Sequence, residues 1–411
     1  MTDREALHRA ILADPDDDTL RLAYADLLEE EDEPDWAAFV REQVALGRLP
    51  EYDAAWVTGG DPSGLPPRLR QALGPLPEGL SWPPQPFHRG FPAAVSAESA
   101  SAFLAHADEL FARFPVESVS LGVVRLSEAR EFTRCRWLPR LRRLEVSEGL
   151  SGQAAERLLD SPRYVRLREL QIGAGLTTPS TAAAVLRSPV FKQLTGLGSR
   201  NDRGGGRALV DGLIRLADPP RLRSLNLAGN RLTAGQLPPL LTAPALAQLE
   251  ELDLSDNNLG PEGVQALAGG PLERLRALRL QRTRPGLAGV SVLGSLLGRL
   301  GLRLLALGDN HLPPAAAWIL TAGPGLAGLH TLDLRGNRLG DAGAQALAAC
   351  PRLRDLVYLD LSENQIEDAG AQALADSPYL DGLRVLCLGG NALTPAAVAR
   401  LRDRFRDALT I

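Results

Sequence analysis

A recurring alternation of leucine and polar residues dominates the C-terminal half of this 411-residue chain. One copy reads Leu-His-Thr-Leu-Asp-Leu-Arg-Gly-Asn-Arg-Leu over residues 329–339. Its first half has the period of a strand with one buried face, so we predict a strand whose leucines point inward and whose intervening residues point outward. Seven clear copies start at successive leucines, 26 or 27 residues apart: Leu222, Leu249, Leu275, Leu302, Leu329, Leu356 and Leu383.

An asparagine closes the strand phrase in nearly every copy. Its carboxamide offers both a donor and an acceptor, so it can satisfy backbone groups of the adjacent copy that strand pairing does not reach. We therefore predict a structural ladder of six residues: Asn230, Asn257, Asn310, Asn337, Asn364 and Asn391. Thr283 stands at this position in one copy, and we expect a weaker rung there because a hydroxyl makes fewer of these bonds.

The second half of each copy has the features of a short helix. Residues 339–348 read Leu-Gly-Asp-Ala-Gly-Ala-Gln-Ala-Leu-Ala, which predicts a turn, an N-cap at Asp341 and a helix with a small inner face. Stacked strands lie about 4.8 Å apart, whereas packed helices need about 8–10 Å. Because that mismatch bends the stack, we predict an α/β solenoid: a horseshoe with a concave parallel β-sheet and convex helices.

Less regular copies extend the array toward the N-terminus. They keep part of the leucine frame and begin near Val116, Leu141, Leu167 and Leu194. With these copies we expect about eleven leucine-rich repeats over residues 116–393, of which seven are clear.

The segments that flank the array are predicted to be caps and a linker. Residues 93–115 and 394–411 have helical patterns, and we expect both to be capping helices because the open ends of a repeat stack must be covered. A helix is predicted from Ala97 onward in the first of them. Residues 50–92 are rich in proline and glycine, which predicts a linker or an irregular cap.

The first 49 residues form a separate acidic helical module. Residues 1–50 carry 14 acidic residues against five arginines, and segments 4–13, 18–30 and 35–46 have the apolar spacing of amphipathic helices. We interpret the aspartates between the first two helices as a capping turn, with Asp18 as the N-cap. Calcium binding is the alternative, but the turn lacks the glycine and the distal glutamate of an EF-hand loop.

Two resemblances follow from these phrases. The repeats resemble the ribonuclease-inhibitor-like class of leucine-rich repeats, whose helix phrase is matched by residues 340–348. Residues 14–30 resemble the repeat-companion domain found ahead of such repeats in planctomycete-type bacterial proteins. The first resemblance implies protein binding through the concave wall without a shared active site, and one branch of the class resembles activators of small GTPases. The second implies a bacterial protein but no mechanism.

Composition and charge narrow the expected function. A net charge of −5 is too small to predict attraction to nucleic acid or to a membrane. No apolar run approaches 18 residues, and the charged N-terminus is unlike a signal peptide. Three cysteines without short spacing argue against a disulfide framework and fit a reducing cytoplasm, where we place the protein. The scattered histidines and the lack of a phosphate-binding loop or nucleophile elbow lead us to expect no metal, no cofactor and no catalytic residue.

The outward strand positions are the predicted partner-binding site. Alternate positions of the strand phrases place nine residues on the concave face: Asn226, Glu251, Asp253, Arg279, Gln281, Asp333, Arg335, Tyr358 and Asp360. Their mixed charge suits a protein partner, and tyrosine is enriched at interface hot spots. The alternative is that these positions are polar only because they face solvent.

We therefore expect a non-catalytic, monomeric scaffold that binds an unidentified partner protein, with neither nucleic acid nor a membrane as a partner. One alternative is a regulator of a small GTPase or another enzyme, acting through Arg282 or Arg284 in the irregular repeat. Another is an adaptor whose N-terminal module docks the effector. A cluster of arginines near Trp137 has the composition of a phosphate site, although solvent-exposed arginines of early repeats are the simpler interpretation.

Overall fold

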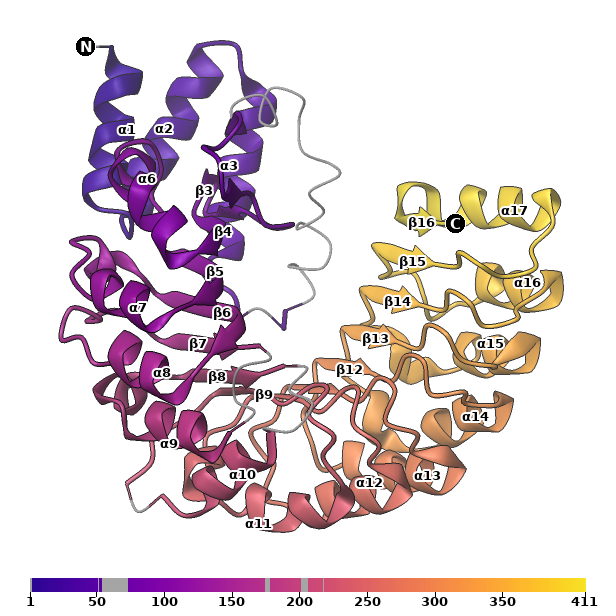
Figure 1. Ribbon diagram of the computed structural model, residues 1–411. Helices are drawn as coiled ribbons and strands as arrows, with labels where there is room; N and C mark the ends of the chain where they lie inside the picture. Colours follow the sequence, from indigo (N-terminus) through magenta and orange to yellow (C-terminus); the bar gives the residue numbers. More distant parts are fainter. Residues whose placement is uncertain (1, 51, 54–72, 174–177, 201–205, 217) are drawn as a thin grey trace. The chain divides into compact units, whose positions relative to one another are not determined.

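The computed structural model describes residues 2–50, 52–53, 73–173, 178–200, 206–216 and 218–411 (Figure 1). Contacts divide the chain into two compact units: unit 1 holds residues 1–51 and 55–198, and unit 2 holds residues 52–54 and 199–411. Strands and helices alternate along both units, and successive strands pair side by side. This arrangement confirms the predicted α/β solenoid of leucine-rich repeats.

Three helices open unit 1: α1 (Asp3–Ala13), α2 (Asp18–Glu30) and α3 (Pro34–Leu46). Their apolar faces bury Ile11, Tyr24 and Val40 in one cluster together with Phe91, which lies outside the helices. The N-cap of α2 is Asp17, whose carboxylate accepts a hydrogen bond from the Thr19 amide at 2.8 Å. The prediction of Asp18 as the cap was wrong, because Asp18 is already helical and its carboxylate binds Arg48 at 2.9 Å.

A twisted sheet follows in unit 1, with strand order β1-β4-β5-β6-β7-β8. Its strands are β1 (Leu80–Ser81), β4 (Ala94–Ser99), β5 (Ser118–Val124), β6 (Arg143–Leu150), β7 (Glu169–Ile172) and β8 (Gly196–Ser199). A separate hairpin joins β2 (Phe87–His88) to β3 (Phe91–Pro92). The helices of this part are α6 (Ala100–Arg113), α7 (Leu126–Phe132), α8 (Gly152–Leu159) and α9 (Pro179–Arg187).

The segment expected to be only a capping helix also supplies a strand. Residues 94–99 form β4, which pairs in parallel with β5, and the helix begins at Ala100 rather than at Ala97. Ser99 sets that boundary, because its hydroxyl accepts a hydrogen bond from the Ala102 amide at 3.1 Å. Within the predicted linker, residues 54–72 lie outside the described residues, and the short strands β1 to β3 occupy part of the rest.

Unit 2 continues the alternation with shorter and more regular strands. They are β9 (Ser224–Asn226), β10 (Glu251–Asp253), β11 (Ala277–Arg279), β12 (Leu304–Ala306), β13 (Thr331–Asp333), β14 (Tyr358–Asp360), β15 (Val385–Cys387) and β16 (Leu409–Thr410). The helices are α10 (Gly206–Ile214), α11 (Leu237–Leu241), α12 (Gly260–Ala268), α13 (Gly286–Leu297), α14 (Pro314–Ala322), α15 (Gly340–Ala348), α16 (Asp368–Asp376) and α17 (Pro395–Phe405). Within unit 2 the strands line the inner side of an arc and the helices lie on its outer side (Figure 1).

The register of unit 2 follows from the leucine frame. The central leucine of each strand from β9 to β15 pairs with the central leucine of the next strand, and all of them are at most 1% exposed. Because side chains alternate across a strand, the flanking residues of each strand point to the opposite, open face. We call this open face of β9 to β15 the concave face.

Two end features differ from the sequence prediction. Asp341 is not an N-cap: it lies inside α15, whose N-cap is Leu339, and its carboxylate accepts from the Glu367 and Gly370 amides of the next repeat at 2.7 and 2.9 Å. At the C-terminus, α17 is followed by strand β16, which pairs in parallel with β15. The terminal cap is therefore a helix and a strand, and the strand covers the exposed edge of the sheet.

The asparagines of unit 2 connect adjacent repeats through buried hydrogen bonds. The Asn257 carboxamide accepts from the Asn230 and Leu232 amides at 3.0 and 2.8 Å and donates to the Leu227 and Leu254 carbonyls, both at 2.9 Å. The same pattern recurs at Asn310, Asn337 and Asn391. At Asn364 the hydrogen bond from the Leu339 amide is longer, at 3.4 Å, while the side chain still donates to the Leu334 carbonyl. At the start of the unit, Asn230 donates to the Ser199 carbonyl.

Thr283 makes a reduced version of this rung. Its hydroxyl donates to the Leu280 carbonyl of its own repeat at 2.7 Å, but its side chain makes no hydrogen bond to the preceding repeat among the described residues. Across the described part of the chain, no helix has both the length and the apolar character needed to cross a membrane.

Candidate functional site

The structure places the predicted partner-binding residues along the concave face of unit 2. Asn226, Asp253, Arg279, Asp333 and Asp360 each hold the last position of their strand, where they line up with the corresponding residues of the neighbouring strands. All five are half-buried, and the remaining candidates lie beside them at other outward positions. One sheet face therefore gathers residues from five repeats.

The aspartates at these positions have a structural role as well as a charge. Asp253, Asp333 and Asp360 each accept a hydrogen bond from the backbone amide two residues later, at 3.0, 2.9 and 2.9 Å. Asn226 makes the same bond at 3.0 Å with an uncharged side chain. The turn at the end of each strand thus needs a side-chain oxygen, whereas the negative charge is an additional property of these positions.

The negative charge gathers around Asp333. Burial raises the pKa of this carboxyl, and the nearby charge of Asp360 raises it further, against the lowering effect of hydrogen bonds from the Arg335 amide and the Gln281 side chain. Tyr358 lies in the next strand, and its hydroxyl donates to Asp360 at 3.4 Å. Burial and the neighbouring Cys387 and Asp360 raise the pKa of Tyr358, so this phenol stays protonated and offers a hydrogen-bond donor.

The other predicted residues are partly neutralised within the chain. Arg279 lies 3.5 Å from Glu251, and Arg335 pairs with Glu363 at 2.5 Å. Gln281 donates to Asp333 at 3.1 Å and accepts from the Ser255 hydroxyl at 2.6 Å. A partner that approaches this face therefore meets a patch whose excess charge is negative.

The arginines considered for GTPase regulation are held differently from each other. Arg282 lies between two aspartates: it binds Asp256 through two nitrogens and Asp309 at 2.8 Å. The two carboxylates raise the pKa of Arg282, and Asp256 has the larger effect. They hold the Arg282 side chain against its own chain. Arg284 is exposed, and its backbone amide donates to Asn310. The geometry of Arg282 is that of an ion-paired structural residue.

The early-repeat arginines and the acidic turn satisfy one another inside unit 1. Asp16 pairs with both Arg142 and Arg166, and Arg142 also lies 3.1 Å from Glu117. The rest of the cluster is engaged as well: Arg136 with Asp108, Arg143 with Glu169, and Arg140 stacked over Trp137. Asp16, in the acidic turn, thus attaches the N-terminal helices to the first repeats through Arg142 and Arg166.

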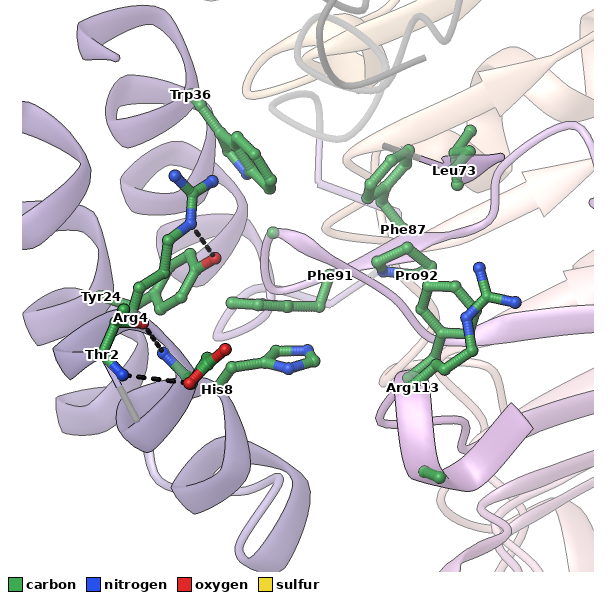
Figure 2. Close-up of a pocket in the computed structure, with 14 residues that line it drawn as sticks. Thr2, Arg4, His8, Tyr24, Trp36, Leu73, Phe87, Phe91, Pro92 and Arg113 are labelled. Atoms are coloured by element: carbon green, nitrogen blue, oxygen red, sulfur yellow. Dashed lines mark hydrogen bonds between the residues drawn. The ribbon is translucent and has the colours of Figure 1, made fainter. Parts of the chain in front are cut away.

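A cavity of about 660 Å³ in unit 1 was not expected from the sequence (Figure 2). It lies between the N-terminal helices, the β2–β3 hairpin and the end of α6, and aromatic rings form much of its lining: Tyr24, Trp36, Phe87, Phe91 and Phe114. Arg4 at its edge is already bound to Glu31, Glu33 and the Tyr24 hydroxyl, at 2.8, 2.9 and 3.2 Å. Burial lowers the pKa of His8, so its imidazole is neutral at pH 7. The cavity therefore combines apolar ring surface with the neutral imidazole of His8.

Comparisons with known proteins agree with the repeat geometry. Leucine Rich repeat family models match residues 221–243, 247–268, 329–348 and 352–375. The chain is 33% identical to the ribonuclease inhibitor of Sus scrofa over 199 residues, which is 41% of this chain and 43% of that protein. It is 34% identical to the ribonuclease inhibitor of Mus musculus over 198 residues, 45% of this chain and 43% of that protein.

The solved structures show the same fold at lower sequence similarity. A chain in the crystal structure of the yeast Rad7 and Elc1 complex aligns with a TM-score of 0.50 and 16% identity, over 76% of this chain and 85% of that one. Together with the strand–helix geometry, the matches identify leucine-rich repeats similar to those of ribonuclease inhibitors. This chain spans less than half the length of the ribonuclease inhibitors that it matches.

Proposed function

We propose that this protein is a non-catalytic interaction scaffold that binds a partner protein on the concave face of unit 2, around residues Glu251 to Tyr358. The observation that carries the proposal is the set of three aspartates, Asp253, Asp333 and Asp360, that project from this face. Asn226 shows that the local turn does not require a charge. The raised pKa of Asp333 shows that the charge there is unfavourable in the isolated protein. A charge kept at a cost to stability, as at Asp333, is typical of a binding surface.

The similar proteins support the same kind of activity. The two ribonuclease inhibitors are named for acting on another protein, and the aligned yeast chain is part of a protein complex. Leucine-rich repeats commonly present such binding surfaces. By charge complementarity, the partner presents basic groups to the aspartates and an acceptor to the Tyr358 hydroxyl. We further propose a cytoplasmic bacterial protein, whose N-terminal helices form a repeat-companion module.

A charge-neutralising variant tests the site. Replacing Asp253, Asp333 and Asp360 together by asparagine removes three charges but keeps an oxygen for each turn, as Asn226 does. Affinity capture from source lysate, followed by titration of the captured partner, should show affinity reduced at least tenfold, or about 1.4 kcal/mol. The affinity of the unaltered protein should also fall with rising salt, because surface charge attraction is screened.

The matched control neutralises charges elsewhere on unit 2. Glu262→Gln with Glu273→Gln alters exposed carboxylates away from the concave face, and we expect this variant to capture the partner as the unaltered protein does. If the triple asparagine variant captures the same partner with the same affinity, the concave face is not the binding site.

A further inference from the structure

An apolar patch interrupts the polar concave face near its centre. Ala277 of β11 and Leu304 and Ala306 of β12 hold outward positions, yet they are 0%, 6% and 4% exposed. On the preceding strand the equivalent positions carry Glu251 and Asp253. A leucine on the open face of a sheet needs a covering group from outside the sheet to leave water.

Tyr52 supplies that cover, although it lies far from the patch in sequence. Tyr52 packs against this cluster, and its hydroxyl donates to the Glu250 carboxylate at 3.5 Å. Burial raises the pKa of Tyr52, and the charges of Glu250 and Glu251 add to this effect, so the phenol remains a donor. Tyr52 therefore sits like an interface anchor, with its ring on an apolar surface and its polar end at the rim.

The charge of Asp53 acts on His330, which follows the patch in the next repeat. Arg303, which directly precedes Leu304 of the patch, donates to the ring of His330 in the next repeat at 2.8 Å. Burial and the Arg303 charge lower the pKa of His330, while the nearby Asp53 charge counteracts them. The patch thus has an acidic edge at Glu250 and a basic edge at Arg303, which is hydrogen-bonded to the His330 ring.

We propose that Tyr52 and Asp53 are a built-in competitor, and that the patch takes from the partner an extended segment in which an aromatic residue precedes an acidic one. The inference rests on the concave-face binding proposed above and specifies the chemistry of one contact there. The chain's own dipeptide shows the fit, because Tyr52 packs on the apolar surface, its hydroxyl donates to Glu250, and the Asp53 charge acts on His330 beside Arg303.

The tether makes this competition selective. A segment attached to the same chain has an effective concentration on the order of millimolar, so a partner that engages the patch alone binds with reduced apparent affinity. A partner that also binds the aspartates gains enough affinity to displace the segment. The dipeptide therefore favours ligands that make both contacts on the concave face.

The test uses full-length protein and a fluorescein-labelled peptide with the sequence of residues 49–54, Leu-Pro-Glu-Tyr-Asp-Ala. Tyr52→Ala empties the patch, so fluorescence anisotropy should show this variant binding the peptide at least tenfold more tightly than the unaltered protein. Replacing the peptide tyrosine by alanine, or its aspartate by arginine, should abolish binding. Equal binding to both proteins, or no binding to the Tyr52→Ala variant up to about 1 mM peptide, would overturn the proposal.

Two further variants locate the bound peptide. Leu304→Asp and Ala306→Asp, each combined with Tyr52→Ala, should remove peptide binding while the circular dichroism spectrum stays unchanged, because both side chains point out of the sheet. Retained binding in both variants would also overturn the proposal. If the peptide does not bind but the triple asparagine variant loses its partner, the proposal that Tyr52 and Asp53 compete with the partner is wrong, and the proposed function stands. If the peptide binds but the triple asparagine variant still captures its partner, the proposed function is wrong.

Discussion

Replacing Asn337 by threonine creates a second copy of the rung that Thr283 forms naturally. In the folded protein, the Asn337 oxygen accepts from the Asn310 and Leu312 amides at 3.1 and 2.9 Å. Its nitrogen donates to the Leu307 and Leu334 carbonyls at 3.1 and 2.8 Å. A threonine hydroxyl keeps only the bond within its own repeat, as Thr283 does with Leu280.

The magnitude follows from the groups that lose a partner. Two buried amide donors of the preceding repeat, at Asn310 and Leu312, are left without the carboxamide oxygen. Each such loss costs about 1–3 kcal/mol, so the sum is about 2–6 kcal/mol. We expect about 2–4 kcal/mol, because the loop can relax toward the arrangement around Thr283, where the Leu259 amide bonds to the Asn257 carbonyl at 2.9 Å.

Urea unfolding followed by circular dichroism measures the total loss, and hydrogen exchange locates it. Because each repeat contacts mainly its neighbours, protection should fall first at residues 310 and 312 and less in distant repeats. The reciprocal variant Thr283→Asn should raise stability by about 1 kcal/mol, because it gives the Asn257 amide an acceptor. A loss below about 1 kcal/mol for Asn337→Thr, or a change in exchange spread evenly over unit 2, would refute the ladder as the connection between repeats.

Three other substitutions test the energetics of named groups. The folded-state pKa of Asp333 lies above its ordinary value of 3.8, so its charge lowers stability at neutral pH, and this penalty disappears as the pH falls through the folded pKa. The Asp333→Asn variant should therefore be more stable than the unaltered protein at pH 7. The difference between their urea midpoints should close near pH 4. Tyr164 is buried, and its hydroxyl has no hydrogen-bond partner among the described residues. Tyr164→Phe should therefore raise the free energy of unfolding by about 1–2 kcal/mol in the same assay. A loss of stability would show that the hydroxyl is hydrogen-bonded. The Arg282 side chain is more than half exposed, so Arg282→Ala should lower the free energy of unfolding by less than about 1 kcal/mol despite the loss of two ion pairs. A larger loss would show that these pairs contribute as buried ion pairs do.

The leucine period and the asparagines of the sequence were sufficient to determine the repeat architecture. Side chains alternate between the two faces of a strand, so only one pairing register buries all the leucines on the same face. The repeat phrase therefore showed which leucines are central and which candidate residues point outward. The asparagine contacts followed for the same reason, since each repeat meets an identical neighbour at a fixed distance along the chain. These are local rules applied many times.

For residues that do not belong to the repeated leucine and asparagine pattern, only the tertiary structure showed which other residues they contact. Asp341 caps the helix of the next repeat rather than its own, because the stacked helices bring the start of α16 to its carboxylate. Residues 94–99 and 409–410 became strands because the open sheet edges offered them backbone partners. Tyr52 reached the apolar patch through packing between distant segments, and no local pattern marks such a contact: the outward Ala277, Leu304 and Ala306 reveal a covered surface, but not the residue that covers it.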